Sequence, residues 1–449
     1  MKQTYTYKEK IRQIMIVLLP IFITQIALIS TGFFDTIMAG NVSEYDLAGV
    51  AVAVNIFMPV FCGVLGVISG LTPIIAQLHG AGQKEQLPFV VVQGIYLSGI
   101  IGIVFILVGC FTIEPLLSSM SLELQVEKIA IGFLKAIAFG ICPILIGSAL
   151  RNFIDALGYT RVTMLITVTS VPMNILMNYL FIFGKCGFPK LGGIGAGVGS
   201  AITYWLVMLI NIFVVYYLKP FKYYKIFSQA YRASFENIKQ QLAIGIPIGS
   251  AIFCEQSIFG AVGLFMAAYG TDIIAAHQAA LNFSTMVYMI PMSISMTLTI
   301  LIGFEVGAKR YRDAKLYTNI GMLISILFSG ILTLVLIAFK GQIAALYTNN
   351  ALINQLIQSF FVYVIFLQLS DGINAPMQGA LRGYKDVKVT LGMAIISYWI
   401  IGLPVGYGLA NYFQTGPYGY WFGLITGVVA GAVLLFVRLR YVRKMNFQC

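Results

Sequence analysis

The chain has 449 residues, of which 59% are hydrophobic and only 10% charged, and its formal net charge is +12 at pH 7. A mean hydropathy of +0.89 over this length excludes a soluble globular protein. The basic excess could indicate a nucleic-acid-binding protein, but the placement of the basic residues, described below, excludes that class as well. The six cysteines contain no CxxC pair, so we expect neither a disulfide framework nor a metal centre built on them.

Apolar segments long enough to cross about 30 Å of hydrocarbon recur along the whole chain. In chain order these twelve segments cover residues 13–38, 46–76, 88–112, 128–150, 161–183, 193–218, 241–268, 273–304, 316–339, 351–380, 387–410 and 419–438. A β-barrel would instead show alternating segments of about ten residues. The first segment is too long for a cleaved signal peptide and no small-residue cleavage pattern follows it. The sequence therefore predicts an all-α polytopic membrane protein with twelve transmembrane helices.

The lysines and arginines lie almost entirely on one side of these segments. If the N-terminus, with Lys2, Lys8, Lys10 and Arg12, is inside, 23 of the 28 basic residues fall in inner segments and four in outer ones. This asymmetry is the positive-inside rule. We therefore expect a multi-pass protein of the plasma membrane with both termini in the cytoplasm and no nucleic-acid partner.

The chain also repeats itself at a spacing of 227 residues. Pairs that coincide at this shift include Pro20 with Pro247, Asn55 with Asn282, Thr72 with Thr299 and Gly80 with Gly307. Six spans per repeat give both halves the same orientation, so the halves should be related by a pseudo-two-fold axis along the membrane normal, with a cavity between them. We expect an N-terminal lobe over residues 1–218, a cytoplasmic linker over 219–240 and a C-terminal lobe over 241–449.

Three acidic residues, Asp35, Glu255 and Asp371, lie inside the apolar segments. A carboxylate at the bilayer centre costs roughly 2.5–3.5 kcal/mol on insertion scales, and such groups usually mark an ion or substrate pathway. At the 227-residue shift none of the three aligns with another acid, so they do not come from the duplication itself. The pattern favours a cation-coupled transporter.

In the second half, Glu255 lies in the seventh segment and Asp371 in the tenth. Both should face the protein interior, since hydrocarbon provides neither a hydrogen-bond donor nor a counter-charge for a carboxylate. Two carboxylates in one lobe could share a proton or bind a monovalent cation such as Na⁺. They could equally be protonated acids that are hydrogen-bonded in the core. We find no basic residue within these segments that could pair with them.

In the first half, Asp35 lies near the outer end of the first segment, and Asn174 and Asn178 lie in the fifth. The four-residue spacing puts both asparagines on one helix face. A carboxylate with amide oxygens forms a plausible Na⁺ site, whereas a proton needs only the carboxylate. The asparagines could also serve interhelical hydrogen bonds alone.

Other residues suggest weaker candidates. His277, near the start of the eighth segment, is either a core residue or a proton relay, and Gln278 beside it could contact substrate. The glycine run from Gly192 to Gly199 should permit close helix packing. Glu305 and Asp313 flank basic residues and should lie in a solvated loop.

Several segments resemble the MATE (multidrug and toxic compound extrusion) family, NorM-like branch, over essentially the full chain. They are FFDTIMAG around Asp35, PIIAQLHGAG ending at Gly82, LGGIGAGVGSAI, AAHQAALNFSTMVYMIPMSIS, and GALRGYKD ending at Asp386. The resemblance implies two six-helix lobes that form a V-shaped central cleft, and antiport of cationic or amphipathic drugs against Na⁺ or H⁺. It implies no cofactor other than the coupling ion, and we expect a monomer in the lipid bilayer.

By the same resemblance, Glu255 and Asp371 match the second-lobe cation-site acids of this branch, and Asp35, Asn174 and Asn178 match its first-lobe polar site. Some relatives carry a tyrosine one turn before the tenth-span aspartate, where this chain has Leu367. Asn178 stands where proton-coupled relatives carry an aspartate, which favours Na⁺ in the first lobe.

Two other classes remain alternatives to a multidrug antiporter. A lipid-linked sugar flippase of the same superfamily should line its cavity with basic residues for pyrophosphate, and here Lys135 is the only clearly intramembrane cation. A membrane enzyme or channel would need a catalytic or filter motif. We find no His-Glu metal motif and no GxxxxGK[ST] loop, so we expect a protein that is not an enzyme.

Overall fold

Lipid offers the backbone no hydrogen-bond partners, so a chain this apolar crosses a bilayer only as helices or as a closed barrel. The computed structural model describes residues 3–120, 122–229 and 231–448, and over these ranges it contains helices and turns but no strand. Lys2, one of the inner basic residues, and Cys449, one of the six cysteines, lie outside the described residues. Twelve helical segments are long and apolar enough to span a membrane, which confirms the predicted fold class.

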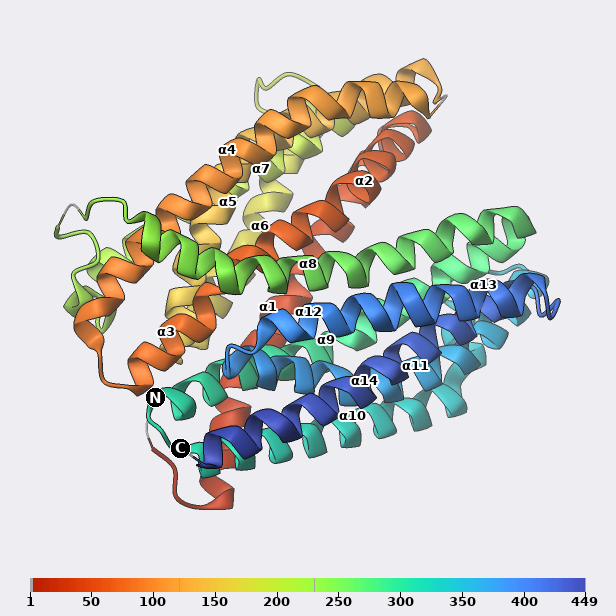
Figure 1. Ribbon diagram of the computed structural model, residues 1–449. Coiled ribbons are helices and arrows are strands. Elements are labelled where there is room, and N and C mark those ends of the chain that lie inside the picture. Colours follow the sequence, from red (N-terminus) through yellow and green to blue (C-terminus); the bar gives the residue numbers. More distant parts are fainter. Residues whose placement is uncertain (1–2, 121, 230, 449) are drawn as a thin grey trace. The chain divides into compact units, whose positions relative to one another are not determined.

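The spans follow the order of the chain (Figure 1). They are α1 (Tyr7–Gly40), α2 (Glu44–Ser69) continued by α3 (Leu71–Gly80), α4 (Leu87–Ser119), α5 (Leu124–Ala156), α6 (Thr160–Phe183), α7 (Gly193–Tyr217), α8 (Phe235–Met266), α9 (Thr271–Gly307), α10 (Tyr311–Ala345), α11 (Ala351–Gly383), α12 (Val387–Ala394) continued by η4 (Ile395–Gly402) and α13 (Leu403–Asn411), and α14 (Pro417–Gln448). Each predicted apolar segment overlaps one of these spans, and most helices extend a few residues beyond it.

Two spans are not uniform helices. The second changes from α2 to α3 at Gly70, where an added Cβ would lie 2.7 Å from the Cα of Gly245. The eleventh contains the eight-residue π-helical segment η4 between α12 and α13. π-Helical turns are rare and often accompany functional sites. This one carries Tyr398, which is 3% exposed and whose hydroxyl accepts a hydrogen bond from Asn374 of α11 at 3.2 Å.

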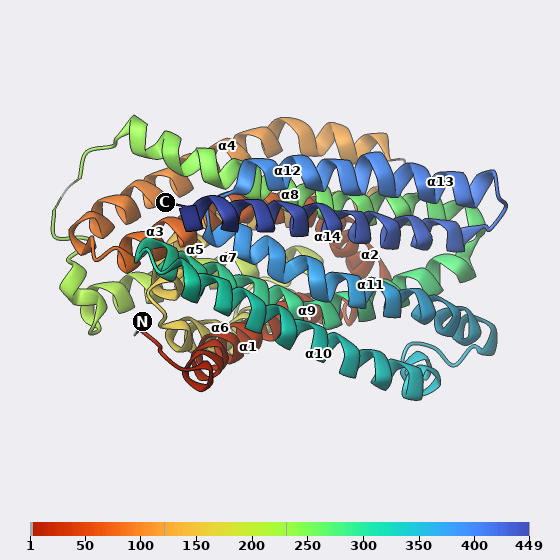
Figure 2. The same ribbon diagram turned by 60° about the horizontal axis from the view of Figure 1, so that its bottom comes forward.

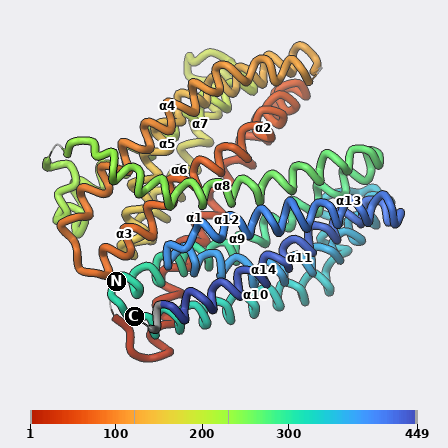
Figure 3. Tube along the Cα trace, in the orientation of Figure 1, coloured from red at the N-terminus to blue at the C-terminus, as the bar shows by residue number. Residues whose placement is uncertain are grey.

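The helices group into two compact units. The first comprises residues 19–249, in which α5 packs on α7, α2 and α4 (Figures 1 and 2). The second comprises residues 250–448 together with the N-terminal segment ending at Leu18, and it is centred on α11, which packs on α9, α10 and α14. Figure 3 traces the chain through these helices. The lobe boundaries at residues 218 and 241 stay a prediction.

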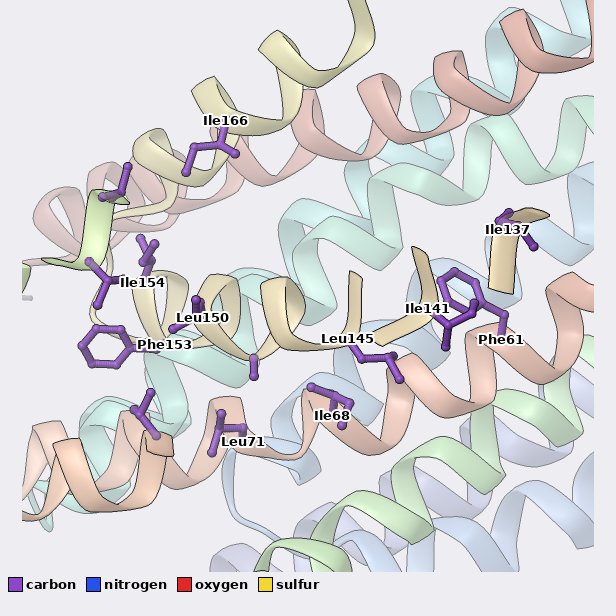
Figure 4. Packing of buried hydrophobic residues seen from close by; sticks show 14 of the residues in the cluster. Phe61, Ile68, Leu71, Ile137, Ile141, Leu145, Leu150, Phe153, Ile154 and Ile166 are labelled. Carbon is purple, nitrogen blue, oxygen red and sulfur yellow. The ribbon is translucent and has the colours of Figure 1, made fainter. Parts of the chain in front are cut away.

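Each unit has its own hydrophobic core. In the first unit, Phe61 and Ile68 from α2 and Leu71 from α3 pack against the face of α5 that carries Ile141 and Leu145 (Figure 4). The glycines of α7 bring further helices close to this core. A Cβ at Gly197 would lie 2.7 Å from the backbone oxygen of Phe133, so the predicted close packing at the glycine run is confirmed.

The prediction of a solvated loop around Glu305 and Asp313 is wrong. Glu305 is only 1% exposed and forms an ion pair with Arg310 at 2.5 Å. Asp313 forms an ion pair at 2.7 Å with Lys10, whose side chain is also 1% exposed. The N-terminal segment therefore belongs to the second unit. There the Asp313 carboxylate balances the buried ammonium of Lys10, which would be unfavourable without a partner.

Candidate cation-coupling sites

Asp35 belongs to a closed ring of four hydrogen-bonded side chains in the first unit. Asn178 donates its amide hydrogens to Asp35 Oδ1 at 2.6 Å and to Asn174 Oδ1 at 3.1 Å. Asn174 donates to Ser200 Oγ at 3.1 Å, and Ser200 donates to Asp35 Oδ2 at 3.0 Å. Each carboxylate oxygen of Asp35 thus accepts one hydrogen bond. The structure brings the three residues predicted for this site together.

Three helices position the ring. Asp35 lies near the end of α1, and the two asparagines lie one turn apart on α6, where both are fully buried. Ser200 comes from α7 and is 1% exposed. Ser200 was not predicted from the sequence, although it directly follows the glycine run. Gly199 carries no Cβ, and only for this reason can α7 approach Asn178 so closely.

The ring offers chemistry suited to a small cation. Asn178 Oδ1 is buried and has no hydrogen-bond partner among the described residues. A buried amide oxygen beside a carboxylate is a hard oxygen ligand, the type that alkali cations prefer. No ion pair reaches Asp35 within the described part of the chain, so its charge would have to be balanced by a bound cation or a proton. The set therefore fits Na⁺, and the carboxylate alone fits H⁺.

The acids of the second unit form a separate polar cluster. Tyr288 of α9 donates its hydroxyl hydrogen to Glu255 Oε1 of α8 at 3.1 Å. Asp371 of α11 is 6% exposed and lies near enough to Glu255 for the two charges to interact. Leu367, where some relatives carry tyrosine, is buried one turn earlier on α11. Tyr288 therefore brings a tyrosine hydroxyl to this cluster from α9 instead.

The expectation that no basic residue could pair with these acids stays a prediction, although one basic residue does lie on the helix that carries Asp371. The predicted tenth segment ended at residue 380, but α11 continues to Gly383 and includes Arg382. Its guanidinium donates to Gln378 Oε1 at 3.3 Å. Among the described residues Arg382 forms no ion pair with Glu255, which accepts a hydrogen bond from Tyr288.

The two residues suggested for a substrate cavity are neighbours on α9, and a Cβ at Gly263 of α8 would lie 4.0 Å from the side chain of each. His277 of α9 is fully buried, and its ring packs edge-on against Trp421 with the ring centres 5.6 Å apart. Both ring nitrogens lack a hydrogen-bond partner within the described ranges. Gln278 is exposed. Among the described residues no three His, Cys, Asp or Glu side chains gather as a metal site.

Comparison with known proteins identifies relatives of this arrangement. The MatE family model matches residues 20–180 and 247–408. The two matches begin 227 residues apart, which confirms the internal repeat. The chain is 49% identical to the "Probable multidrug resistance protein NorM" of Bacillus licheniformis over 99% of this chain and 98% of the relative. It is 47% identical to the protein of the same name in Bacillus subtilis strain 168, over 100% of this chain and 99% of the relative.

Solved structures show the same fold. A eukaryotic MATE transporter, AtDTX14, superposes with a TM-score of 0.88 at 19% identity, over 98% of this chain and 99% of that chain. An outward-facing multidrug resistance MATE family transporter of the MOP superfamily gives a TM-score of 0.88 at 18% identity, over the whole of both chains.

Proposed function

Since this chain belongs to the MATE family, we propose that it is a multidrug efflux antiporter that exports cationic or amphipathic compounds in exchange for Na⁺ or H⁺. The relatives that are nearly half identical to it over their full length carry the name of a multidrug resistance protein. The chain is a multi-pass membrane protein. The ion gradient supplies the driving force, so the cycle needs neither a cofactor nor an enzymatic step.

One observation carries the ion-coupling part of this proposal. Asp35 is held by Asn178 and Ser200 in a ring that contains no basic side chain. A carboxylate without a counter-charge in hydrocarbon is unfavourable, so a cation or a proton must accompany it whenever the site is closed to water. Binding and release of that ion can thus be tied to the transport cycle.

Efflux of ethidium from proteoliposomes tests the proposal. The purified protein is reconstituted, and transport is started by a Na⁺ jump at constant pH or by a pH jump without Na⁺. The gradient that drives efflux identifies the coupling ion. Asp35→Asn should abolish ion-driven efflux, because an amide neither titrates nor balances a cation.

Glu114→Gln is the matched control, since Glu114 is an exposed membrane-helix acid that is ion-paired with Lys135 at 2.6 Å. It should transport like the wild type. Ion-driven efflux by Asp35→Asn at the wild-type rate would show that Asp35 is structural. Absence of efflux by the wild type under both gradients would refute antiport.

We further propose that both termini and the linker over residues 219–240 are cytoplasmic, as the distribution of basic residues predicts. In a background without the native cysteines, Gln229→Cys should react with a membrane-impermeant maleimide only after the cells are opened. Lys190→Cys should react in intact cells. The reverse pattern would overturn this orientation.

The flippase alternative finds little support here. Lys135, the intramembrane cation on which it would depend, is 65% exposed and is already paired with Glu114. Its charge is therefore not free for a pyrophosphate group. Movement of a lipid-linked pyrophosphate, rather than ethidium, in the same vesicles would favour the flippase.

A further inference from the structure

A cavity of about 660 Å³ lies at one end of the first unit and is lined by residues other than those of the Asp35 ring. Its walls come from the turn between α3 and α4, the turn between α5 and α6, and the segment after α7, which can be followed on the left of Figure 1. These segments follow the second, fourth and sixth spans, so they leave the bundle on the same side of the membrane. The volume lies within the usual range of ligand pockets, about 300–1,000 Å³.

The segment after α7 is fixed against the unit and forms one wall of the cavity. Phe221 of η2 (Phe221–Tyr224) is 1% exposed, and its ring packs edge-on against that of Tyr159 with the ring centres 5.3 Å apart. Further along the segment, Gln93 of α4 donates to the Arg232 carbonyl oxygen at 2.9 Å. The wall is therefore held on either side by contacts with the helix bundle.

Two lysines line the cavity, one from each of two walls. Lys84 lies in η1 (Lys84–Gln86), between α3 and α4, and Lys225 directly follows η2. Neither forms an ion pair within the described ranges, although Glu85 also lines the cavity. From residue 219 to residue 232 the sequence contains four basic residues and no acid. The cavity therefore has an excess of positive charge and favours an anion.

The rest of the lining and its position point to a lipid. Tyr159, Tyr223 and Tyr224 line the cavity together with the lysines, and tyrosine and lysine are the residues that contact headgroups at a membrane boundary. Directly before the segment, α7 exposes Phe213 and Tyr217, which are 55% and 58% exposed. A positively charged cavity at the end of the spans thus lies beside an apolar helix face.

We propose that this cavity binds the phosphate group of an anionic phospholipid, with Lys84 and Lys225 balancing its charge and the acyl chains lying along α7. Ammonium groups and tyrosine hydroxyls are both donors that phosphate oxygens accept from. A soluble phosphate compound carries the same charge but has no chains to cover the apolar residues of α7, so a lipid is the favoured source. The inference goes beyond the proposed antiport and does not depend on it.

Native mass spectrometry of the protein in detergent measures the binding. The protein is titrated with phosphatidylglycerol, with phosphatidylcholine of the same chain length, and with inorganic phosphate. Phosphatidylglycerol should bind about 10-fold more tightly than either, because phosphatidylcholine has no net charge and inorganic phosphate has no chains. Equal affinity for the two lipids would refute the proposal. Inorganic phosphate that binds as tightly as phosphatidylglycerol would exclude the lipid and indicate a site for a soluble phosphate compound.

Variants of the lining residues assign the binding to this cavity. Lys84→Gln and Lys225→Asn should each weaken the tightest binding of phosphatidylglycerol by about 5-fold, the effect of one basic residue near a membrane surface. Glu85→Gln should tighten it, since the change removes a negative charge from the lining. Lys239→Gln is the matched control, because Lys239 is an exposed lysine of α8 outside the cavity lining. If Lys239→Gln weakens binding as much as Lys84→Gln does, a general effect of net charge replaces the proposed site.

Lys225→Asn also separates lipid binding from folding. Lys225 has φ 49° and ψ 43°, in the left-handed region, which asparagine adopts more readily than lysine. Without added lipid, the variant should therefore unfold at the wild-type temperature or above it. Added phosphatidylglycerol should raise its Tm less than it raises that of the wild type, because a ligand stabilises only the fold that binds it. A folded Lys225→Asn protein with the full wild-type shift would contradict the proposal.

Discussion

A methyl group at Gly199 is the smallest change that should disturb the Asp35 ring without touching any of its members. An added Cβ there would collide with Asn178 Oδ1 and would lie 3.0 Å from the Asn178 backbone nitrogen and 3.2 Å from the Met177 carbonyl carbon. The two backbone atoms cannot move without moving α6. In Gly199→Ala, therefore, either α7 shifts away from α6 or the Asn178 side chain turns aside.

The structure gives the scale of the effect. Asn178 would lose its hydrogen bond to the Asp35 carboxylate at 2.6 Å and its bond to Asn174 at 3.1 Å. A bond to a charged group contributes about 1.5–3 kcal/mol and a neutral one about 0.5–1.5 kcal/mol. A combined change of about 2–4 kcal/mol corresponds to roughly 30-fold to 1,000-fold in ion affinity.

The assay is the half-saturating ion concentration for ethidium efflux in proteoliposomes, with thermal unfolding measured on the same preparations. Gly99→Ala is the matched control, because a Cβ at Gly99 in α4 meets no atom within 4 Å. Alanine is favoured over glycine inside a helix by about 1 kcal/mol, so this variant should transport normally and be at least as stable as the wild type. A Gly199→Ala protein with wild-type ion dependence would refute the role of close packing in forming the site.

Three further predictions concern Ser200 of the Asp35 ring, the buried ion pair of Lys10, and the effect of the membrane potential. Ser200→Ala removes one hydrogen bond to Asp35 and should shift the half-saturating ion concentration by about 10-fold in the same efflux assay; an unchanged value would show that the ring works without Ser200. Lys10→Met leaves Asp313 without its partner and should lower the stability of the protein by about 2 kcal/mol, several degrees in Tm, whereas the exposed Arg12→Met should not; equal melting of the two variants would contradict this. Efflux of a monovalent drug cation should be electrogenic, because uptake of one extra charge contributes roughly 2.3 kcal/mol per 100 mV, about 50-fold in drug gradient; a steady-state gradient that is the same at 0 and −100 mV, clamped with K⁺ and valinomycin, would exclude net charge movement.

The sequence predicted the spans because hydrophobic length alone decides which segments can cross a bilayer. It also predicted which acids are unusual, since a carboxylate inside an apolar segment stands out without any knowledge of its neighbours. The pairing of Asn174 with Asn178 followed from helical spacing. All these inferences depend on local pattern, and the structure brings the predicted first-half residues into one ring.

The remaining site residues depend on contacts between helices, which local pattern does not reveal. Ser200 and Tyr288 belong to residue types that are common throughout the chain, and only the packing of α7 and α9 selects them. Arg382 was assigned to a loop because the apolar segment ends two residues earlier, while the helix continues and directs the guanidinium back along its own face. Lys10 looked like one of several basic residues near the N-terminus, yet it is buried against Asp313.

The two units, although duplicated in sequence, therefore surround their buried carboxylates with different side chains. In the first unit a single acid is surrounded by amides and a hydroxyl, with no counter-charge. In the second, two acids are accompanied by one arginine. Each arrangement contains at least one carboxylate that forms no ion pair among the described residues, so each has a negative charge to be balanced. Since an unbalanced carboxylate in hydrocarbon is unfavourable, each unit would demand one monovalent cation before it can close to water. Two cations entering against one departing drug cation would move net charge, which is why the membrane potential, in addition to the ion gradient, should drive efflux.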